Sequence, residues 1–138
     1  MLFRSLVEVI STPHTDPNIF NTAWDFIRSI GKTPVRCQDT PGFIVNRVAR
    51  PYYLEAMRAV EAGEVNPEMV DRIMESAGFK LGPFKLTDLI GQDVNLAVSR
   101  SVYEQLGNPE RLKPSVLQEE LVKAGKLGRK SGEGFYRY

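Results

Sequence analysis

The sequence predicts a mainly α-helical chain in two parts, a strand–helix–strand segment over residues 1–38 and an all-helical domain over residues 39–138. A short stretch rich in β-branched residues, 5–12, and a second strand-like stretch, 32–37, flank a segment with apolar residues at helical spacing. Beyond residue 39 the apolar residues keep that spacing between glycine and proline breaks. The 138 residues, 42% of them hydrophobic, fit roughly one domain of about 100–150 residues.

The first part is predicted to be one crossover unit of a parallel sheet. Ser5–Thr12 is short and β-branched, which predicts a strand. The Asp-Pro pair at 16–17 supplies an N-cap and a first-turn proline for a helix that Gly31 ends. Lys32–Cys37 predicts the second strand. Two strands alone form no stable parallel sheet, because such a sheet is normally covered on both faces and has further strands. We therefore expect residues 1–38 to be the end of a larger α/β domain.

The second part is predicted to begin with its longest helix. Asp39 or Thr40 can cap this helix, Pro41 fits its first turn, and the helical spacing continues to Ala62, before Gly63. Its apolar positions cover more than one stripe, which indicates a helix packed on several sides. Further helices are predicted from Asn66 to Gly78, from about Gln92 to Leu106 and from Pro114 to Lys123, followed by a glycine-spaced loop and an aromatic strand or tail.

Composition excludes several classes of function. With 18 basic and 17 acidic residues, the net charge of +1 gives no field that favours nucleic acid or an anionic membrane. The apolar runs are far shorter than the ~20 residues that span a bilayer, and the start has no pattern of a signal peptide. The single cysteine, Cys37, excludes an internal disulfide and indicates a reducing, cytoplasmic compartment. The single histidine, His14, is expected in a solvated loop, and no zinc cluster is predicted.

Asn46 interrupts an otherwise apolar stretch at the start of the long helix. A buried amide without partners costs about 1–3 kcal/mol, so this side chain should be hydrogen-bonded or face an opening. It either bonds a nearby carbonyl or water, or donates to a ligand from early in the helix. The residue pattern leaves both interpretations open.

Two charged residues leave similar alternatives. Glu8 lies inside a predicted strand, where alternation could point it at solvent. A carboxylate at a strand end can instead orient an imidazole, although His14 is no convincing partner. Lys130 lies in the glycine-rich stretch "GRKSGEG", which is either a solvated loop or a backbone that approaches phosphate or ribose. No GxGxxG or GxxxxGK[ST] motif is present, so the chain has no complete nucleotide-phosphate cradle.

Five segments in order carry a resemblance to a known family: "LVEVI", "GKTPV", "TPGFIVNR", "GPFKLTDLIGQD" and "GRKSGEGFY". In this combination the chain resembles the L-3-hydroxyacyl-CoA dehydrogenases from about Leu6 to Tyr138. "NRVARPYYLEA" and "LIGQDVN" look most like bacterial 3-hydroxybutyryl-CoA dehydrogenases and members from phenylacetate-type β-oxidation. The resemblance implies that residues 1–38 end an NAD-binding Rossmann domain and that residues 39–138 form the helical substrate and dimerisation domain.

The resemblance also implies a chemistry. A 3-hydroxyacyl-CoA is oxidised to a 3-oxoacyl-CoA by hydride transfer to NAD, while a histidine takes the hydroxyl proton, in fatty-acid or aromatic-acid β-oxidation. Glu8 matches the glutamate that pairs with this histidine, and Asn46 matches the asparagine that bonds the reacting part of the substrate. Lys130 matches a lysine near the nicotinamide cofactor. The implied protein is a cytoplasmic homodimer that acts on acyl-CoA, without a metal, nucleic acid or membrane partner.

The chain also departs from the family pattern. The catalytic histidine, in a motif HxFxP before "LVE", and the dinucleotide fingerprint are both missing. We therefore expect this chain to be a fragment that is inactive alone, with NAD bound mainly by the missing N-terminal domain. The alternative is a non-catalytic helical dimerisation or acyl-CoA-binding module. A fragment should expose apolar surface, for which Phe3, Leu6, Val35 and parts of 82–90 are candidates.

Overall fold

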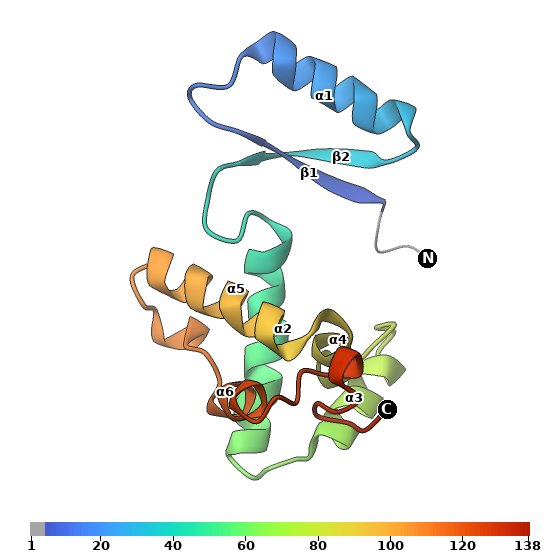
Figure 1. Ribbon diagram of the computed structural model, residues 1–138, viewed down its shortest axis with the longest axis vertical. Helices are drawn as coiled ribbons and strands as arrows, with labels where there is room; N and C mark the ends of the chain where they lie inside the picture. Colours follow the sequence, from blue (N-terminus) through green and yellow to red (C-terminus); the bar gives the residue numbers. More distant parts are fainter. Residues whose placement is uncertain (1–4) are drawn as a thin grey trace. The chain divides into compact units, whose positions relative to one another are not determined.

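The computed structural model describes residues 5–138, which form two compact units, one up to Arg47 and one over Val48–Tyr138. The first unit contains β1 (Leu6–Ser11), α1 (Pro17–Ser29) and β2 (Thr33–Gln38). The unit boundary lies inside α2 (Val45–Glu61). The second unit continues with α3 (Pro67–Ser76), α4 (Pro83–Ile90), α5 (Gln92–Gln105), η1 (Glu110–Leu112), α6 (Val116–Lys123) and η2 (Arg129–Ser131). The predicted, mainly helical fold class is confirmed (Figure 1).

The first unit is the predicted strand–helix–strand crossover. β1 and β2 pair in parallel, from Leu6 opposite Thr33 to Ser11 opposite Gln38, and α1 covers one face of the pair (Figure 1). The Asp16 side chain accepts a hydrogen bond of 2.7 Å from the amide of Asn18, which caps α1 as the sequence indicated.

Much apolar surface of the first unit is uncovered within the unit itself. Phe20 of α1 is buried, whereas Ile19, Phe26 and Ile30 are 53–69% exposed. The expected exposure of Leu6 is confirmed, Val35 is half-buried, and Phe3 lies outside the described residues. Of the 82–90 segment, 82–84 and 87–88 are buried, and its exposed residues are Leu89 and Ile90.

The start of α2 differs from the prediction. The sequence placed the helix start at residues 39–41, but α2 begins at Val45. Gly42 and Phe43 have φ values of +75° and +50°, and a right-handed helix cannot run through this left-handed region. The amide of Phe43 bonds the carbonyl of Thr40 at 2.9 Å. The segment that looked like a helix cap is therefore a tight turn before the helix.

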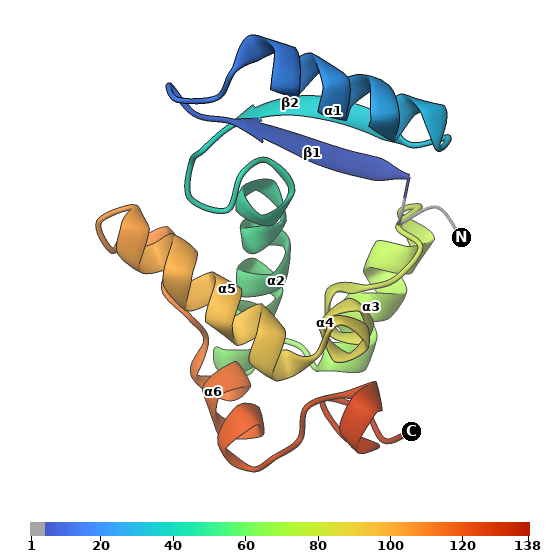
Figure 2. The same ribbon diagram turned by 45° about the horizontal axis from the view of Figure 1, so that its top comes forward.

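The second unit is built around α2, which α5 crosses in both views (Figures 1 and 2). One apolar cluster joins Tyr53, Ala56 and Met57 of α2 to Phe84 of α4. A second cluster joins Leu54 of α2 to Val102 of α5 and Leu112 of η1. The predicted packing of the long helix on several sides is confirmed. Within residues 5–138, no helix is both long and apolar enough to cross a bilayer.

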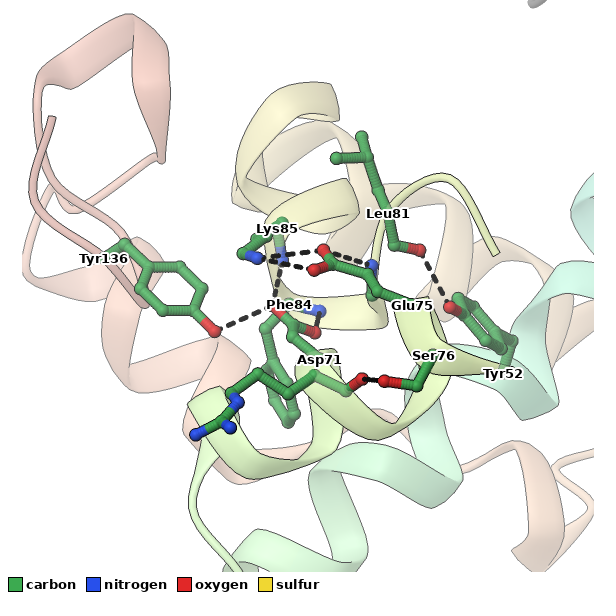
Figure 3. Close-up of polar contacts among 10 residues, drawn as sticks. Tyr52, Asp71, Glu75, Ser76, Leu81, Phe84, Lys85 and Tyr136 are labelled. Carbon is green, nitrogen blue, oxygen red and sulfur yellow. Dashed lines mark hydrogen bonds and ion pairs between the residues drawn. The ribbon is translucent and has the colours of Figure 1, made fainter. Parts of the chain in front are cut away.

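The C-terminal segment is a docked loop rather than the expected strand or tail. It contains the short helix η2 and isolated bridges that pair Glu133 with Gly128 and Arg137. Buried Asp71 accepts bonds of 2.9 Å from the amides of Phe84 and Lys85 at the start of α4, and one of 2.7 Å from the Tyr136 hydroxyl (Figure 3). One carboxylate therefore fixes both α4 and the end of the chain.

Asp88 of α4 makes a second attachment of this segment. Its buried carboxylate accepts bonds of 3.0 Å from the amides of Phe135 and Tyr136 and from the Tyr138 hydroxyl. A Cβ added at Gly134 would lie 2.1 Å from Asp88 Oδ1, so only glycine permits this approach. The aromatic ending of the sequence thus serves to anchor the loop.

Candidate functional site

Glu8 of β1 caps the helix that carries Asn46. Its Oε1 accepts hydrogen bonds from the backbone amides of Ile44, at 2.7 Å, and Val45, at 3.1 Å. The first amides of a helix lack partners within the helix and lie at its positive end, so an acceptor side chain is favoured there. A residue 36 positions earlier in the chain therefore fixes the start of α2. The alternative in which Glu8 simply faces solvent is not what the structure has.

Asn46 follows immediately, in the first turn of α2, and is half-buried. Because Glu8 bonds the amide of the preceding residue, the structure brings the carboxylate and the amide-bearing turn together. The first unit thus holds two of the three predicted site residues in one place.

The one cysteine of the chain, Cys37, lies on the second strand of this sheet. Cys37 of β2 is buried, and its Sγ lies 3.1 Å from the carbonyl of Gln38. Burial, and after it the negative charge of Glu8, raise the pKa of the Cys37 thiol. A raised pKa keeps the thiol protonated at neutral pH.

Lys130, the third predicted residue, belongs to the second unit and is ion-paired. Its Nζ lies 2.5 Å from Oδ1 of Asp93 and donates to Oδ2 at 2.7 Å. The hydrogen bond from Lys130 lowers the pKa of the Asp93 carboxyl, which lies in the first turn of α5. The ammonium group is therefore neither a freely solvated cation nor an isolated charge for a polyanion.

Sequence reasoning missed Asp93 and Arg50. Asp93 carries the usual signal of an acidic residue in a first helical turn, but this signal does not give its partner. Arg50 follows Asn46 by one helical turn, a spacing that places the two on one face of α2. Its guanidinium is buried and donates to Ser99 Oγ at 2.8 Å and to the carbonyl of Asn95 at 3.1 Å. Burial lowers the pKa of this guanidinium.

A dinucleotide would find only part of its site here. The turn between β1 and α1 has no glycine, and the described residues that line the ~420 Å³ depression at the carboxyl ends of both strands include no cation. A pyrophosphate does not fit this lining. Lys130 and Asp93, a donor beside an acceptor, do fit a hydroxyl-bearing group. No group of metal-ligating side chains is formed within residues 5–138.

Two family models match the chain and together cover nearly all of it. Residues 42–138 match the C-terminal domain of 3-hydroxyacyl-CoA dehydrogenase. Residues 3–40 match the NAD binding domain of 3-hydroxyacyl-CoA dehydrogenase.

Curated proteins with similar sequences carry consistent names. The chain is 52% identical over 132 residues to 3-hydroxyadipyl-CoA dehydrogenase of Escherichia coli K12. The matched residues cover 95% of this chain and 28% of that protein. It is 44% identical over 134 residues to the mitochondrial hydroxyacyl-coenzyme A dehydrogenase of Mus musculus, covering 96% of this chain and 43% of that protein. The chain therefore spans less than half the length of these relatives.

Solved structures agree in backbone geometry. The 3-hydroxybutyryl-CoA dehydrogenase of Escherichia coli K12 superimposes with a TM-score of 0.91 at 51% identity, over 96% of this chain and 28% of that one. FadB2 of M. tuberculosis superimposes with a TM-score of 0.92 at 38% identity, over 97% of this chain and 47% of that one.

Proposed function

The chain belongs to the 3-hydroxyacyl-CoA dehydrogenase family, and from this premise we propose that it is part of an NAD-dependent L-3-hydroxyacyl-CoA dehydrogenase. The proposed reaction oxidises a 3-hydroxyacyl-CoA to a 3-oxoacyl-CoA in β-oxidation. Residues 1–38 would end the NAD-binding domain, and residues 39–138 would form the helical domain. We further propose a cytoplasmic homodimer that pairs through the helical domain.

The observation that carries this proposal is the pair of bonds from the first amides of α2 to Glu8 Oε1. These bonds hold the carboxylate at the start of α2, where it would accept an N–H from an imidazole outside the chain. When that histidine takes the substrate's hydroxyl proton, the negative charge of Glu8 stabilises the imidazolium. Glu8 would therefore act on the histidine and on α2 at once.

Asn46 would act on the substrate oxygen. Its side-chain amide would donate to this oxygen from the first turn of α2, where the positive end of the helix also favours developing negative charge. Bound NAD supplies the acceptor for the hydride, and Lys130 with Asp93 are the residues of this chain that would hold it. In this proposal Asn46 serves the substrate, Glu8 serves the histidine, and Lys130 with Asp93 serve the cofactor.

The test measures NADH formation from NAD⁺ and 3-hydroxyacyl-CoA thioesters by the full-length protein that carries this chain. Asn46→Ala should lower kcat by roughly 10²–10³-fold, the loss typical of removing one oxyanion donor. Val48→Ala is the matched control, because Val48 lies on the same helix and is 71% exposed.

Two results would contradict the proposal. Wild-type kcat in Asn46→Ala would remove the role given to this residue. Failure of the full-length wild-type protein to oxidise 3-hydroxyacyl-CoA thioesters of short and long chain would overturn the proposed function itself.

A further inference from the structure

The helix that carries Asn46 contains a proline close to its start. α2 runs from Val45 to Glu61 with Pro51 inside it, and proline has no backbone N–H. The carbonyl of Arg47 therefore cannot receive the usual helical hydrogen bond from residue 51. The first turn of α2 is thus joined to the rest of the helix by one backbone bond fewer than in an uninterrupted helix. Its orientation depends correspondingly more on contacts made by side chains.

Arg50, directly before this proline, makes such contacts. It is 2% exposed, and its guanidinium donates to Ser99 Oγ at 2.8 Å and to the carbonyl of Asn95 at 3.1 Å, both on α5. The guanidinium carbon also lies 5.0 Å from the centre of the Tyr53 ring, which is within the range of a cation–π contact. A planar guanidinium with several donors fixes orientation as well as distance. Arg50 therefore ties the early part of α2 to α5.

The α5 side of this attachment is itself held in place. Asn95 Oδ1 accepts a bond of 3.2 Å from Gln118 Nε2 of α6, and the same nitrogen donates to Gln92 Oε1 at 2.8 Å. Gln92 Nε2 in turn donates at 2.6 Å to Asp88 of α4, the carboxylate that anchors the C-terminal loop. These four linked side chains are at most 1% exposed and come from three helices. Arg50 therefore bonds a buried, fixed support rather than a mobile surface group.

From these contacts we propose that Arg50 is a positioning residue, which orients the first turn of α2 and with it the Asn46 amide. The inference rests on the proposed function and adds to it a residue that touches neither substrate nor cofactor. Glu8 bonds the amide directly before Asn46, and Arg50 holds the helix one turn after it. Because Arg50 acts through Asn46, its loss should lower activity only while the Asn46 amide is present.

The test is a double-mutant cycle in the full-length protein that carries this chain. Arg50→Met keeps a long, unbranched side chain and removes the donors. It should lower kcat roughly tenfold, because a misplacement of about 1 Å near a reacting group can cost up to about 10²-fold. The Kd for NADH, measured by calorimetry, should stay that of the wild type. In an Asn46→Ala background, Arg50→Met should lower kcat no further, because the two residues act as one unit.

Two milder variants keep the test decisive if Arg50→Met folds poorly. Arg50→Lys retains the charge without the planar fork, and Ser99→Ala removes one acceptor of the guanidinium. Each should lower kcat about threefold, as expected when one hydrogen bond of the attachment is lost. Both losses should again disappear in the Asn46→Ala background.

Arg58→Met is the matched control. Arg58 is an arginine of the same helix, beyond Pro51, and its guanidinium also donates to two backbone carbonyls, of Glu110 at 3.1 Å and of Arg111 at 2.7 Å. This variant should lower the midpoint of urea unfolding and keep the kcat of the wild type.

Three results would contradict the inference while the wild type remains active. These are wild-type kcat in Arg50→Met, equal losses of kcat in Arg50→Met and Arg58→Met, and a loss in Arg50→Met that multiplies with that of Asn46→Ala. The last result would show that Arg50 acts independently of Asn46. Absence of turnover in the wild type would instead overturn the proposed function, and this inference with it.

Discussion

The two units of the chain differ in how they bury their side chains. Up to Arg47, the buried apolar residues of the described set are Val9, Phe20 and Cys37, while Ile19, Phe26 and Ile30 remain exposed. From Val48 onward the helices enclose two apolar clusters and bury a set of polar groups that includes Arg50, Asp71, Asp88, Gln92, Asn95, Ser99 and Gln118. Buried polar groups require partners, and here most come from other helices of the same unit. The helical unit therefore supplies its own core and its own hydrogen-bond partners, whereas the crossover unit lacks cover for α1.

The largest effect is expected at Asp88. Asp88→Asn replaces a buried carboxylate that accepts from two backbone amides and the Tyr138 hydroxyl. Because hydrogen bonds to a charged group contribute about 1.5–3 kcal/mol each, we expect the free energy of unfolding to fall by roughly 3–5 kcal/mol in urea titrations. Asp39→Asn, an exposed position of the first unit, should leave it unchanged. Equal losses in both variants would break the contrast between the units.

A somewhat smaller effect is expected at Gly134. In Gly134→Ala the new Cβ would meet Asp88 Oδ1 at 2.1 Å and the Gly128 backbone at 2.7 Å, so the loop must shift. We expect a loss of ~3 kcal/mol in thermal or chemical unfolding, the upper range for overpacking. Gly132→Ala, two residues earlier, finds open space and has only the cost of a left-handed φ of +80°, about 1–2 kcal/mol. A larger loss of unfolding free energy in Gly132→Ala than in Gly134→Ala would show that the loop is not docked as described.

The smallest effect is expected at Glu8. Glu8→Gln keeps an oxygen for the amides of Ile44 and Val45 but removes the charge that favours the helix start, a change of about 0.5–1 kcal/mol. Native-state hydrogen exchange should show faster exchange at these amides and unchanged protection in α5. Equal acceleration in α5 would mean that the two units do not respond separately.

Local patterns predicted most elements because their causes are local. The Asp16 cap and the proline after it fixed the start of α1, and the apolar spacing fixed α3, α5 and α6 to within a few residues. The predicted start of α2 was wrong because Phe43 adopts a positive φ, which is uncommon for a residue with an aromatic side chain and has no local sequence signal. The docked loop was missed because Asp71 and Asp88 reach it from far along the chain.

For the candidate site, too, the sequence suggested the residues, and the structure supplied their partners. The residue pattern left Glu8 and Asn46 ambiguous, and the family resemblance alone gave them roles. Their proximity depends on a bond between residues 36 positions apart, which no local spacing reveals. The pairing of Lys130 with Asp93 likewise joins residues 37 positions apart. Long-range partners, rather than residue types, are what the structure adds.

The two-stranded sheet has one further consequence, which follows from Pro34. The amide of Thr33 bonds the carbonyl of Ser5, so in β2 the amides of alternate residues face β1 and the position of Pro34 faces outward. Proline has no N–H, so the outer margin of β2 is short of a donor just where a foreign strand would begin to pair. The outer edge of β1 is therefore better suited than that of β2 to pair with a further strand.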